Sequence, residues 1–328
     1  MTFDHVAVIG GGAWGTALAQ AAAMAGRSVS LVVRSAEQAA SINATRINEK
    51  SLPGQILSPA ISAVTSLGAA DLIIMAVPAQ TTRSVLAALD PRLLDNKPVI
   101  LSAKGLEQGT LERQSAIVEQ LCPTAVPYVL SGPSFAADLA SGRPTAVTLA
   151  GDDDEATEAI AAALAGPSFR LYAADDRTGV EIAGALKNVY ALACGAIEGA
   201  NLGASARAAL IARGYAEMAR MVTAMGGSAS TLTGLAGMGD LTLTCTSSQS
   251  RNYQFGIALG AGRSTQDILA SGAKLAEGVA TAPVAAALAK TLGVDAPLID
   301  AVDAVVSGTS NIATVVAGLM SRPLKRED

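Results

Sequence analysis

Short apolar runs alternate with helix-like segments through the first half of the chain. The runs are rich in β-branched residues and almost free of charge: Val6–Ile9, Val29–Val33, Asp71–Val77, Pro98–Ser102, Tyr128–Ser131 and Ala146–Ala150. Such runs are typical of parallel strands buried on both faces of a sheet. The intervening segments Thr16–Ala25 and Thr81–Ala88 predict helices. This alternation predicts βαβ units and an α/β fold with a doubly wound Rossmann sheet.

From Asp176 onward the pattern becomes almost entirely helical. Gly and Asn clusters separate the predicted helices, which are Gly179–Ile197, Ala204–Met225, Asn252–Leu259, Thr265–Ala270, Ala280–Leu292, Leu298–Val306 and Thr309–Met320. We therefore expect an NAD(P)-binding Rossmann domain over residues 1–180 and an all-α substrate and catalytic domain over residues 181–328. A substrate is expected to bind between the two domains.

The composition of the chain narrows the classes of molecule that it could bind. The 328 residues suit two domains, and with 50% hydrophobic but only 3% aromatic residues the core must be aliphatic. A net charge of -5 without a basic cluster argues against binding to nucleic acid or anionic membranes. The start of the chain has no basic n-region, and neither charge-free stretch forms an apolar run of about 20 residues. We expect a soluble cytoplasmic protein without membrane insertion.

The cysteine and histidine content excludes several kinds of site. The three cysteines are scattered and form no C-x-x-C pair, so we expect buried free thiols. His5 is the only histidine, which excludes a histidine-rich metal site, and we expect no metal. His5 also precedes the first strand, at the edge opposite the strands' carboxyl ends, where it cannot serve a bound substrate. Another residue must carry any proton transfer.

A glycine-rich turn follows the first predicted strand. The segment VAVIGGGAWGTALAQ reads as a strand, then GGGAWG at residues 10–15, then a helix. Gly10 permits the tight turn, Gly12 lets the backbone approach a pyrophosphate, and Gly15 lets the helix pack near the strand. The helix N-terminus offers free N–H groups and a partial positive charge to the phosphates. The turn predicts a nicotinamide dinucleotide site.

The end of the second predicted strand bears on which dinucleotide binds. NAD sites usually place Asp or Glu about 20 residues after the turn, to bind the ribose 2′-hydroxyl. Here Arg34 follows the strand, and no acid occupies that place. Arg34 could pair with the 2′-phosphate of NADP, or it could be an exposed strand-end arginine.

Two lysines are candidates for the missing proton acceptor. Lys187 lies in VEIAGALKNVYALACG, a predicted helix that is otherwise largely apolar, with Asn188 beside it. A lysine there either extends its charge to the surface or serves a function, and burial can lower a lysine pKa enough for acid–base work. Lys104 follows the strand Pro98–Ser102, at the carboxyl end of the sheet.

Three glycine-rich loops carry further polar residues. SGPSFAADLA at 131–140 follows a strand and should lead into a helix, and GLAGMGDLTLTC at 234–245 holds Asp240. SSQSRNYQFG at 247–256 places Arg251, with a serine and an asparagine on either side, at the start of a helix. That arrangement suits a phosphate monoester, although a capping loop with an exposed arginine would look the same.

Taken together, these segments resemble the bacterial-type NAD(P)-dependent glycerol-3-phosphate dehydrogenases. The resemblance rests on ordered motifs that cover nearly the whole chain: GGGAWGTALA, AVPAQ (76–80), SAKGLE, SGPSFA, GALKNV, AGMGDLTLTC, SQSRN and AEG (276–278). It implies reversible reduction of dihydroxyacetone phosphate to sn-glycerol 3-phosphate with NADPH, and NADH is the second candidate reductant. The reaction would supply glycerophospholipid synthesis, and the resemblance favours a homodimer.

The resemblance also implies roles for individual residues. Lys187 matches the family's proton acceptor, and Asp240 would orient it or a substrate hydroxyl. The substrate-contacting positions are matched by Lys104, Gly132, Ser134, Asp240, Ser250, Arg251 and Asn252. The cofactor-contacting positions are matched by Gly10, Gly12, Ala13, Trp14, Gly15, Arg34, Lys104, Ala136, Arg251, Leu275 and Glu277.

The chain departs from the family pattern at three places. Ala13 replaces a frequent Ser or Thr, Asp138 replaces a frequent Glu, and Leu275-Ala276 replaces a pair that is commonly valine. None of these replaced positions is a proposed catalytic residue.

Two other classes of protein remain open on the residues alone. One is a β-hydroxyacid dehydrogenase whose catalytic lysine lies on a helix, and the other is a dinucleotide-sensing protein without turnover. A dinucleotide-sensing protein has no need for Lys187, Asp240 and the Ser250–Asn252 cradle together.

Overall fold

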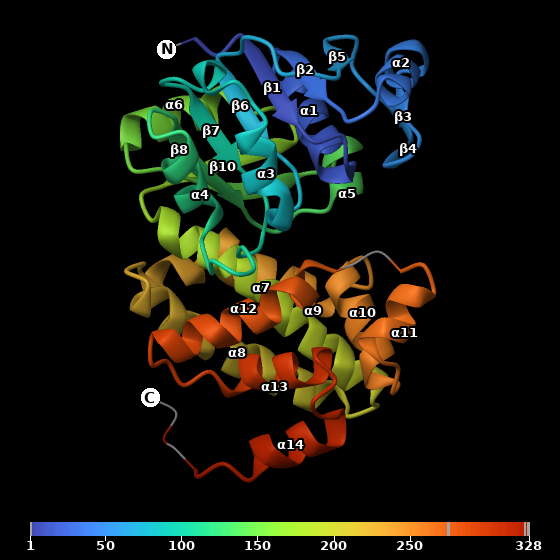
Figure 1. The fold of residues 1–328 in the computed structure, drawn as a ribbon, viewed down its shortest axis with the longest axis vertical. Coiled ribbons are helices and arrows are strands. Elements are labelled where there is room, and N and C mark those ends of the chain that lie inside the picture. The colour runs from blue at the N-terminus through green and yellow to red at the C-terminus, as the bar shows by residue number, and fades with distance from the viewer. Residues whose placement is uncertain (1, 274–275, 325, 327–328) are drawn as a thin grey trace.

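The chain forms a sheet domain followed by a helical domain, in a computed structural model that describes residues 2–273, 276–324 and 326. In Figure 1 the sheet domain lies above and the helical domain below, with the N-terminus at the end away from the helices. The eight strands follow one another across the sheet in the order β10 (Phe169–Ala174), β9 (Thr145–Ala150), β8 (Val126–Ser131), β7 (Pro98–Leu101), β6 (Leu72–Met75), β1 (His5–Ile9), β2 (Ser28–Val32) and β5 (Ile61–Val64). This confirms the predicted doubly wound α/β architecture.

The sheet differs from the prediction in its last two strands. The run Ala146–Ala150 is a strand, as expected, but β9 pairs antiparallel with β8, and β10 runs parallel to β9. The sequence analysis also missed β5, β10 and the small hairpin of β3 (Ile47–Asn48) and β4 (Leu52–Ile56). The edge strand β10 is partly exposed, so its sequence lacks the continuous apolar run of the central strands.

Helices cover the sheet. The helices of this part are α1 (Ala13–Met24), α2 (Ala36–Thr45), α3 (Thr82–Ala87), α4 (Gln114–Leu121), α5 (Ala136–Ala140) and α6 (Asp154–Leu164). The two predicted from the apolar pattern correspond to α1 and α3, and α1 begins three residues earlier than expected. Of the others, α5 was expected after SGPSFA, whereas α4 and α6 were not predicted.

The second half is helical in the described residues, as predicted. Its helices are α7 (Arg177–Gly199), α8 (Ala204–Ala224), α9 (Asp240–Thr246), α10 (Arg251–Gly260), α11 (Thr265–Ala270), α12 (Glu277–Thr291), α13 (Pro297–Val306) and α14 (Ile312–Met320). All but α9 were expected from the apolar pattern. The proposed boundary between residues 180 and 181 falls inside α7, so that division stays a prediction.

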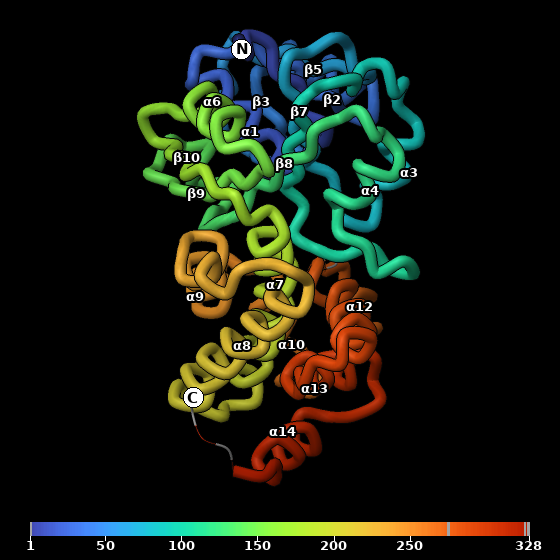
Figure 2. The backbone as a smooth tube through the Cα atoms, turned by 90° about the vertical axis from the view of Figure 1, so that its left-hand side faces the viewer, coloured from blue at the N-terminus to red at the C-terminus, as the bar shows by residue number. Residues whose placement is uncertain are grey.

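Helix α7 is the centre of the helical domain. It runs from the sheet domain into the middle of the helices, as Figure 2 shows. Within the described residues it alone is long and apolar enough to cross a membrane, but 94% of that apolar window is buried inside the protein. A core helix of this kind needs no lipid, because neighbouring helices cover its apolar surface.

A buried carboxylate fixes α7 to the sheet domain. Glu181 accepts hydrogen bonds from the Ser115 backbone N–H at 3.0 Å and from the Ser115 hydroxyl at 2.6 Å, at the start of α4. Arg113 lies 3.6 Å from the same carboxylate. Burial raises the pKa of Glu181, while these partners act in the opposite direction. The contact holds the N-terminal half of α7 against the carboxyl edge of the sheet.

Candidate active site

The glycine turn between β1 and α1 is shaped as the sequence predicted. Gly10 has a φ of +123°, and a Cβ there would lie 2.6 Å from the Ala76 carbonyl oxygen. A Cβ on Gly15 would lie 2.0 Å from the Gly10 carbonyl oxygen, so only glycine permits this packing. Gly12 is the N-cap of α1, has no side-chain cap, and faces open space. The first-turn N–H groups of α1 are therefore accessible to a phosphate.

Three side chains from outside the turn fix its central carbonyl. The Gly11 carbonyl oxygen accepts from Ser51 Oγ at 2.9 Å, Asn48 Nδ2 at 3.0 Å and Gln38 Nε2 at 3.3 Å. Two of these donors lie on or beside the β3–β4 hairpin, which the sequence analysis did not predict. Three donors on one carbonyl hold the turn in one conformation.

The remaining predicted cofactor residues lie around this turn or across from it. Trp14 packs against the sheet core, and its buried Nε1–H has no partner among the described residues. Ala136 begins α5, which packs on α1, and Arg34 is exposed after β2. Leu275 lies outside the described residues. The open space at Gly12 and the uncapped backbone N–H groups at the start of α1 fit a dinucleotide pyrophosphate.

Two lysines from different domains bind one buried carboxylate. Lys187 Nζ on α7 donates to Asp240 Oδ1 at 2.8 Å, and Lys104 Nζ, after β7, donates to Asp240 Oδ2 at 2.6 Å. Lys104 Nζ also donates to the Gly132 carbonyl oxygen at 2.9 Å. Asp240 is 1% exposed and Lys187 is 7% exposed. The structure thus brings together four residues that the sequence analysis had selected separately.

The local backbone explains how Asp240 reaches this position. Leu235–Gly239 forms one π-helical turn directly before α9, and such turns are frequent at functional sites. A Cβ on Gly237 would lie 2.2 Å from the Leu232 carbonyl oxygen, so the turn needs glycine there. Asp240 is the first residue of α9, with its carboxylate directed at the two lysines.

Thr244 is a site residue that the sequence analysis missed. It lies one turn beyond Asp240 on α9, accepts a hydrogen bond from Lys187 Nζ at 2.7 Å, and donates to Asp240 Oδ1 at 3.2 Å. Residues four positions apart on a helix share a face, so the spacing from Asp240 could have indicated it. Thr244 and Asp240 together fix the direction of the Lys187 ammonium group.

Burial and neighbouring charges shift the pKa values of Asp240 and Lys104. Burial acts to raise the pKa of Asp240, but the charges and hydrogen bonds of Lys104 and Lys187 outweigh it and hold that pKa below its ordinary value. Burial lowers the pKa of Lys104 to about 8; the Lys187 charge adds to this, and Asp240 opposes it. Asp240 is therefore a stable anion, while Lys104 titrates just above neutral pH.

A chain of amides connects the walls of the site. Asn188 Nδ2 donates to the Lys104 carbonyl oxygen at 2.8 Å, and Asn252 Nδ2 donates to Asn188 Oδ1 at 2.7 Å. Asn252 Oδ1 in turn accepts from the Gly278 backbone N–H at 2.9 Å, at the start of α12. The chain ties the Lys104 loop, α7, α10 and α12 into one network.

The proposed phosphate residues gather at the start of α10. Ser250 is buried and caps this helix, accepting from the Tyr253 backbone N–H at 3.2 Å, while Arg251 is exposed. Burial raises the pKa of Glu277, and the charge of Arg251 acts against that rise, which places the two side chains near each other. On the facing loop, Ser134 Oγ donates to the Gly132 carbonyl oxygen at 3.1 Å.

The fold and this site define a two-domain dehydrogenase of the nicotinamide-dinucleotide class. A phosphate-binding glycine turn lies at the carboxyl edge of a doubly wound sheet, where such folds bind dinucleotides. A buried lysine–carboxylate pair from the helical domain lies at the same edge. Comparison with known proteins identifies the family within this class.

The chain belongs to the NAD-dependent glycerol-3-phosphate dehydrogenase family. The family's N-terminal model matches residues 5–157, and its C-terminal model matches residues 176–317. The chain is 53% identical over 324 residues to a glycerol-3-phosphate dehydrogenase [NAD(P)+] of Methylobacterium radiotolerans, covering 98% of this chain and 97% of the relative. A protein of the same name from Caulobacter vibrioides is 48% identical and covers 100% of both chains.

A solved structure agrees over nearly the full length. The crystal structure of glycerol-3-phosphate dehydrogenase from Coxiella burnetii superposes with a TM-score of 0.91 at 34% identity, covering 98% of this chain and 99% of that chain. The resemblance inferred from the ordered motifs is confirmed. The chain is an NAD(P)-dependent oxidoreductase of this family.

Proposed function

We propose that this protein catalyses the reversible reduction of dihydroxyacetone phosphate to sn-glycerol 3-phosphate, with NADPH or NADH as the reductant. The observation that carries the proposal is the buried Lys187–Asp240 pair beside the glycine turn, with Lys104 on the same carboxylate. Carbonyl reduction needs a proton donor at the developing alkoxide, and Lys187 supplies one in a site with little water.

Each residue of the pair has a defined task. In the reducing direction Lys187 Nζ gives its proton to the substrate oxygen at C2, and in the oxidising direction it takes the hydroxyl proton. Asp240 stays ionised and, with Thr244, holds Nζ in place. When bound, the dinucleotide supplies or accepts the hydride. Asp240 also stabilises the charge of Lys104 beside the anionic substrate.

The substrate phosphate is assigned to the start of α10. Arg251 offers a planar pair of donors, Asn252 is held by the amide chain, and the Ser250 hydroxyl keeps its proton free to donate while it caps the helix. Lys104, Gly132 and Ser134 form the facing wall of the substrate site. The N-terminus of α10 adds a partial positive charge.

The dinucleotide is assigned to the edge of the sheet. Gly10, Gly12 and Gly15 shape the pyrophosphate turn, with Ala13 and Trp14 beside it. The further cofactor contacts that we propose come from Arg34, Lys104, Ala136, Arg251 and Glu277. Leu275 is part of the same proposal, on the family resemblance alone.

Replacing Arg34 should discriminate the two dinucleotides. Loss of a charge-assisted contact to the 2′-phosphate costs about 1.5–3 kcal/mol, or roughly 10–100-fold in affinity. We expect Arg34→Ala to raise the KM for NADPH by that factor and to leave the KM for NADH unchanged. Arg92→Ala, at an arginine that precedes β7 and is 84% exposed, should change neither. An equal effect on both dinucleotides would remove Arg34 from the 2′-phosphate site.

The pKa of Lys104 predicts a pH dependence. Because its protonated form attracts the substrate phosphate, kcat/KM for dihydroxyacetone phosphate should fall about tenfold from pH 7 to pH 9 as Lys104 loses its proton with a pKa of about 8. Lys104→Arg stays charged and should remove this part of the fall. Lys290→Arg, at an exposed position, should keep the wild-type profile. An unchanged profile in Lys104→Arg would contradict the role of Lys104.

The proposal also covers where the enzyme works and how it is assembled. We propose that the enzyme works in the cytoplasm as a homodimer and supplies sn-glycerol 3-phosphate to glycerophospholipid synthesis. Its two domains are residues 1–180 and 181–328.

The reaction itself is tested by incubating the purified protein with dihydroxyacetone phosphate and NADPH. sn-Glycerol 3-phosphate should form in equal amount to the NADP+ produced; NADPH oxidation without this product would overturn the proposal.

A further inference from the structure

The loop that carries Lys104 is held by side chains from outside the loop. Lys104, Gly105 and Leu106 lie in no helix or strand. Their three consecutive carbonyl oxygens each accept a hydrogen bond from the side-chain amide of a different residue: Lys104 from Asn188 at 2.8 Å, Gly105 from Gln114 at 3.1 Å and Leu106 from Gln80 at 2.7 Å. Carbonyls inside a protein need such partners where no regular element supplies them. The three amides therefore fix the backbone from which the Lys104 side chain extends.

Gln80 holds the loop through both atoms of its amide. Its Nε2 donates to the Leu106 carbonyl oxygen, and its Oε1 accepts from the Gln108 backbone N–H at 2.9 Å. A residue in a parallel strand contacts its neighbour in the same way, through the groups on either side of the residue opposite. Gln80 follows β6, which pairs parallel with β7, so it extends this pairing beyond the strands. We call these two hydrogen bonds the Gln80 clamp.

The clamped loop is packed between the two domains. Leu106 is 0% exposed and belongs to the hydrophobic core of the helical domain. Gln108 Nε2 donates to the Ala280 carbonyl oxygen on α12 at 3.3 Å. From the start of this loop Lys104 reaches Asp240 at 2.6 Å. A shift of the loop backbone would therefore move the ammonium group away from that carboxylate.

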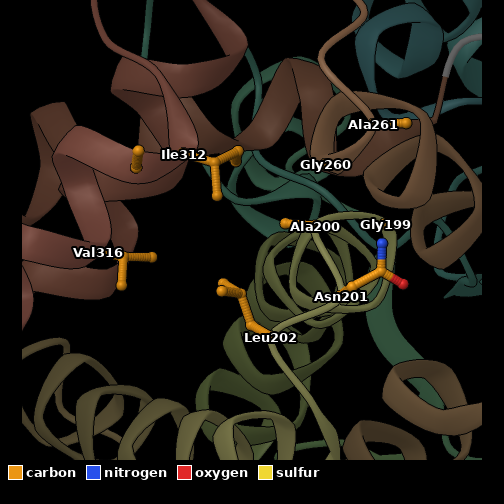
Figure 3. Close-up of a pocket in the computed structure, with 9 residues that line it drawn as sticks. Gly199, Ala200, Asn201, Leu202, Gly260, Ala261, Ile312 and Val316 are labelled. Carbon is orange, nitrogen blue, oxygen red and sulfur yellow. The ribbon is translucent and has the colours of Figure 1, made fainter.

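The three amides differ in how far they are buried. Gln114 is 0% exposed at the start of α4, and Asn188 lies in the buried part of α7. Helix α7 reaches the surface at its other end, where Gly199 and Ala200 line the open pocket in Figure 3. Gln80 is exposed. Replacing Gln80 therefore removes the clamp without leaving a cavity in either core.

We propose that Gln80 is a positioning residue of the reaction, which holds the loop so that Lys104 stays on Asp240 and beside the substrate phosphate. The inference rests on the proposed function, which places Lys104 in the substrate site. It gives a role to the last residue of the AVPAQ segment (76–80). Gln80 acts through the backbone of Leu106 and Gln108 and makes no contact of its own with the substrate.

The test is a double-mutant cycle on kcat/KM for dihydroxyacetone phosphate near neutral pH. Lys104→Ala loses a charge-assisted contact to the phosphate, which should lower kcat/KM roughly 10–100-fold. Gln80→Ala should lower it about tenfold, chiefly through KM, and should cause no further loss in the Lys104→Ala background, because residues that act through one contact are not additive. Gln266→Ala, at an exposed amide on α11, should have no effect in either background. Additive losses, or an unchanged kcat/KM in Gln80→Ala, would overturn the proposal.

A second measurement follows the Lys104 amine without turnover. A lysine reacts with acetic anhydride in its neutral form, so the midpoint of the Lys104 rate against pH, followed by mass spectrometry, reports its pKa. In the wild type burial lowers this pKa to about 8, with Asp240, Lys187 and Glu277 as the surrounding charges. Gln80→Ala should release Lys104 into water and raise the midpoint toward about 10.4. An unchanged midpoint would contradict the clamp.

The two measurements separate this proposal from the proposed function. A wild type that does not reduce dihydroxyacetone phosphate would overturn the function, while the acetylation midpoint would still test the clamp. An active wild type whose kcat/KM and Lys104 midpoint are both insensitive to Gln80→Ala would overturn the clamp alone. Lys290, exposed on α12, is the internal control, and its acetylation rate should be the same in both proteins.

Discussion

Lys187→Met should lower turnover of dihydroxyacetone phosphate by at least about a hundredfold while leaving dinucleotide binding intact. Removing a general acid–base group typically costs 10²–10⁴-fold in rate. Methionine keeps the length and apolar stem of lysine, so the packing of α7 should survive. The glycine turn lies on a different element, and NADPH affinity should therefore change little. Stopped-flow measurement of hydride transfer and fluorescence titration of NADPH measure the two quantities separately.

The control for this variant is a lysine outside the site. Lys290→Met changes the same residue type at an exposed position on α12 and should retain wild-type turnover. Near-normal turnover in Lys187→Met would remove the proton transfer from Lys187. A loss of NADPH binding alongside turnover would point instead to misfolding of the site.

Asp240→Asn should cost both stability and activity. Asp240 is 1% exposed and is the acceptor for two lysines, so the amide leaves both ammonium groups facing a neutral partner. Removing one partner of a buried ion pair typically destabilises a protein by about 3–5 kcal/mol. We expect a loss of that size in the free energy of unfolding, measured by urea denaturation. Turnover should fall as well, since Lys187 loses one of its two positioning contacts.

The matched control is Asp138→Asn. Asp138 also forms an ion pair, at 2.7 Å with Arg143, but Arg143 is 70% exposed. Exposed ion pairs contribute about 0–1 kcal/mol, so this variant should be nearly as stable as the wild type. Equal stability losses in the two variants would show that Asp240 has no special place in the fold.

The sequence predicted those parts of the fold whose signal lies in a few consecutive residues. The central strands are continuous apolar runs, and the glycine turn between β1 and α1 has a spacing set by backbone geometry. The direction of β9 was wrong, because an apolar run has the same composition whichever way the strand pairs. The β3–β4 hairpin was missed because Pro53 and Gly54 interrupt its pattern, although it brings Asn48 and Ser51 to the turn.

In the site, too, single residues could be predicted from their neighbours in the sequence, whereas their contacts with distant residues could not. Lys187 was found because a charge in an apolar helix is unusual, and Asp240 because it lies among glycines. Their contact joins residues 53 positions apart, and the Lys104 contact spans 136 positions. No local signal encodes pairing over such distances. The family resemblance selected the same residues. The spacing from Asp240 could have indicated Thr244 only if the short helix α9, which carries both residues, had been predicted.

The most direct test of the central claim compares two substrates with one NADPH preparation. Initial rates of NADPH oxidation should be measured with dihydroxyacetone phosphate and with a β-oxoacid such as tartronate semialdehyde. Because Arg251, Lys104 and the N-terminus of α10 are assigned to a phosphate, kcat/KM should be at least about a hundredfold higher for dihydroxyacetone phosphate. A preference for the carboxylate substrate, or no oxidation with either, would contradict the account.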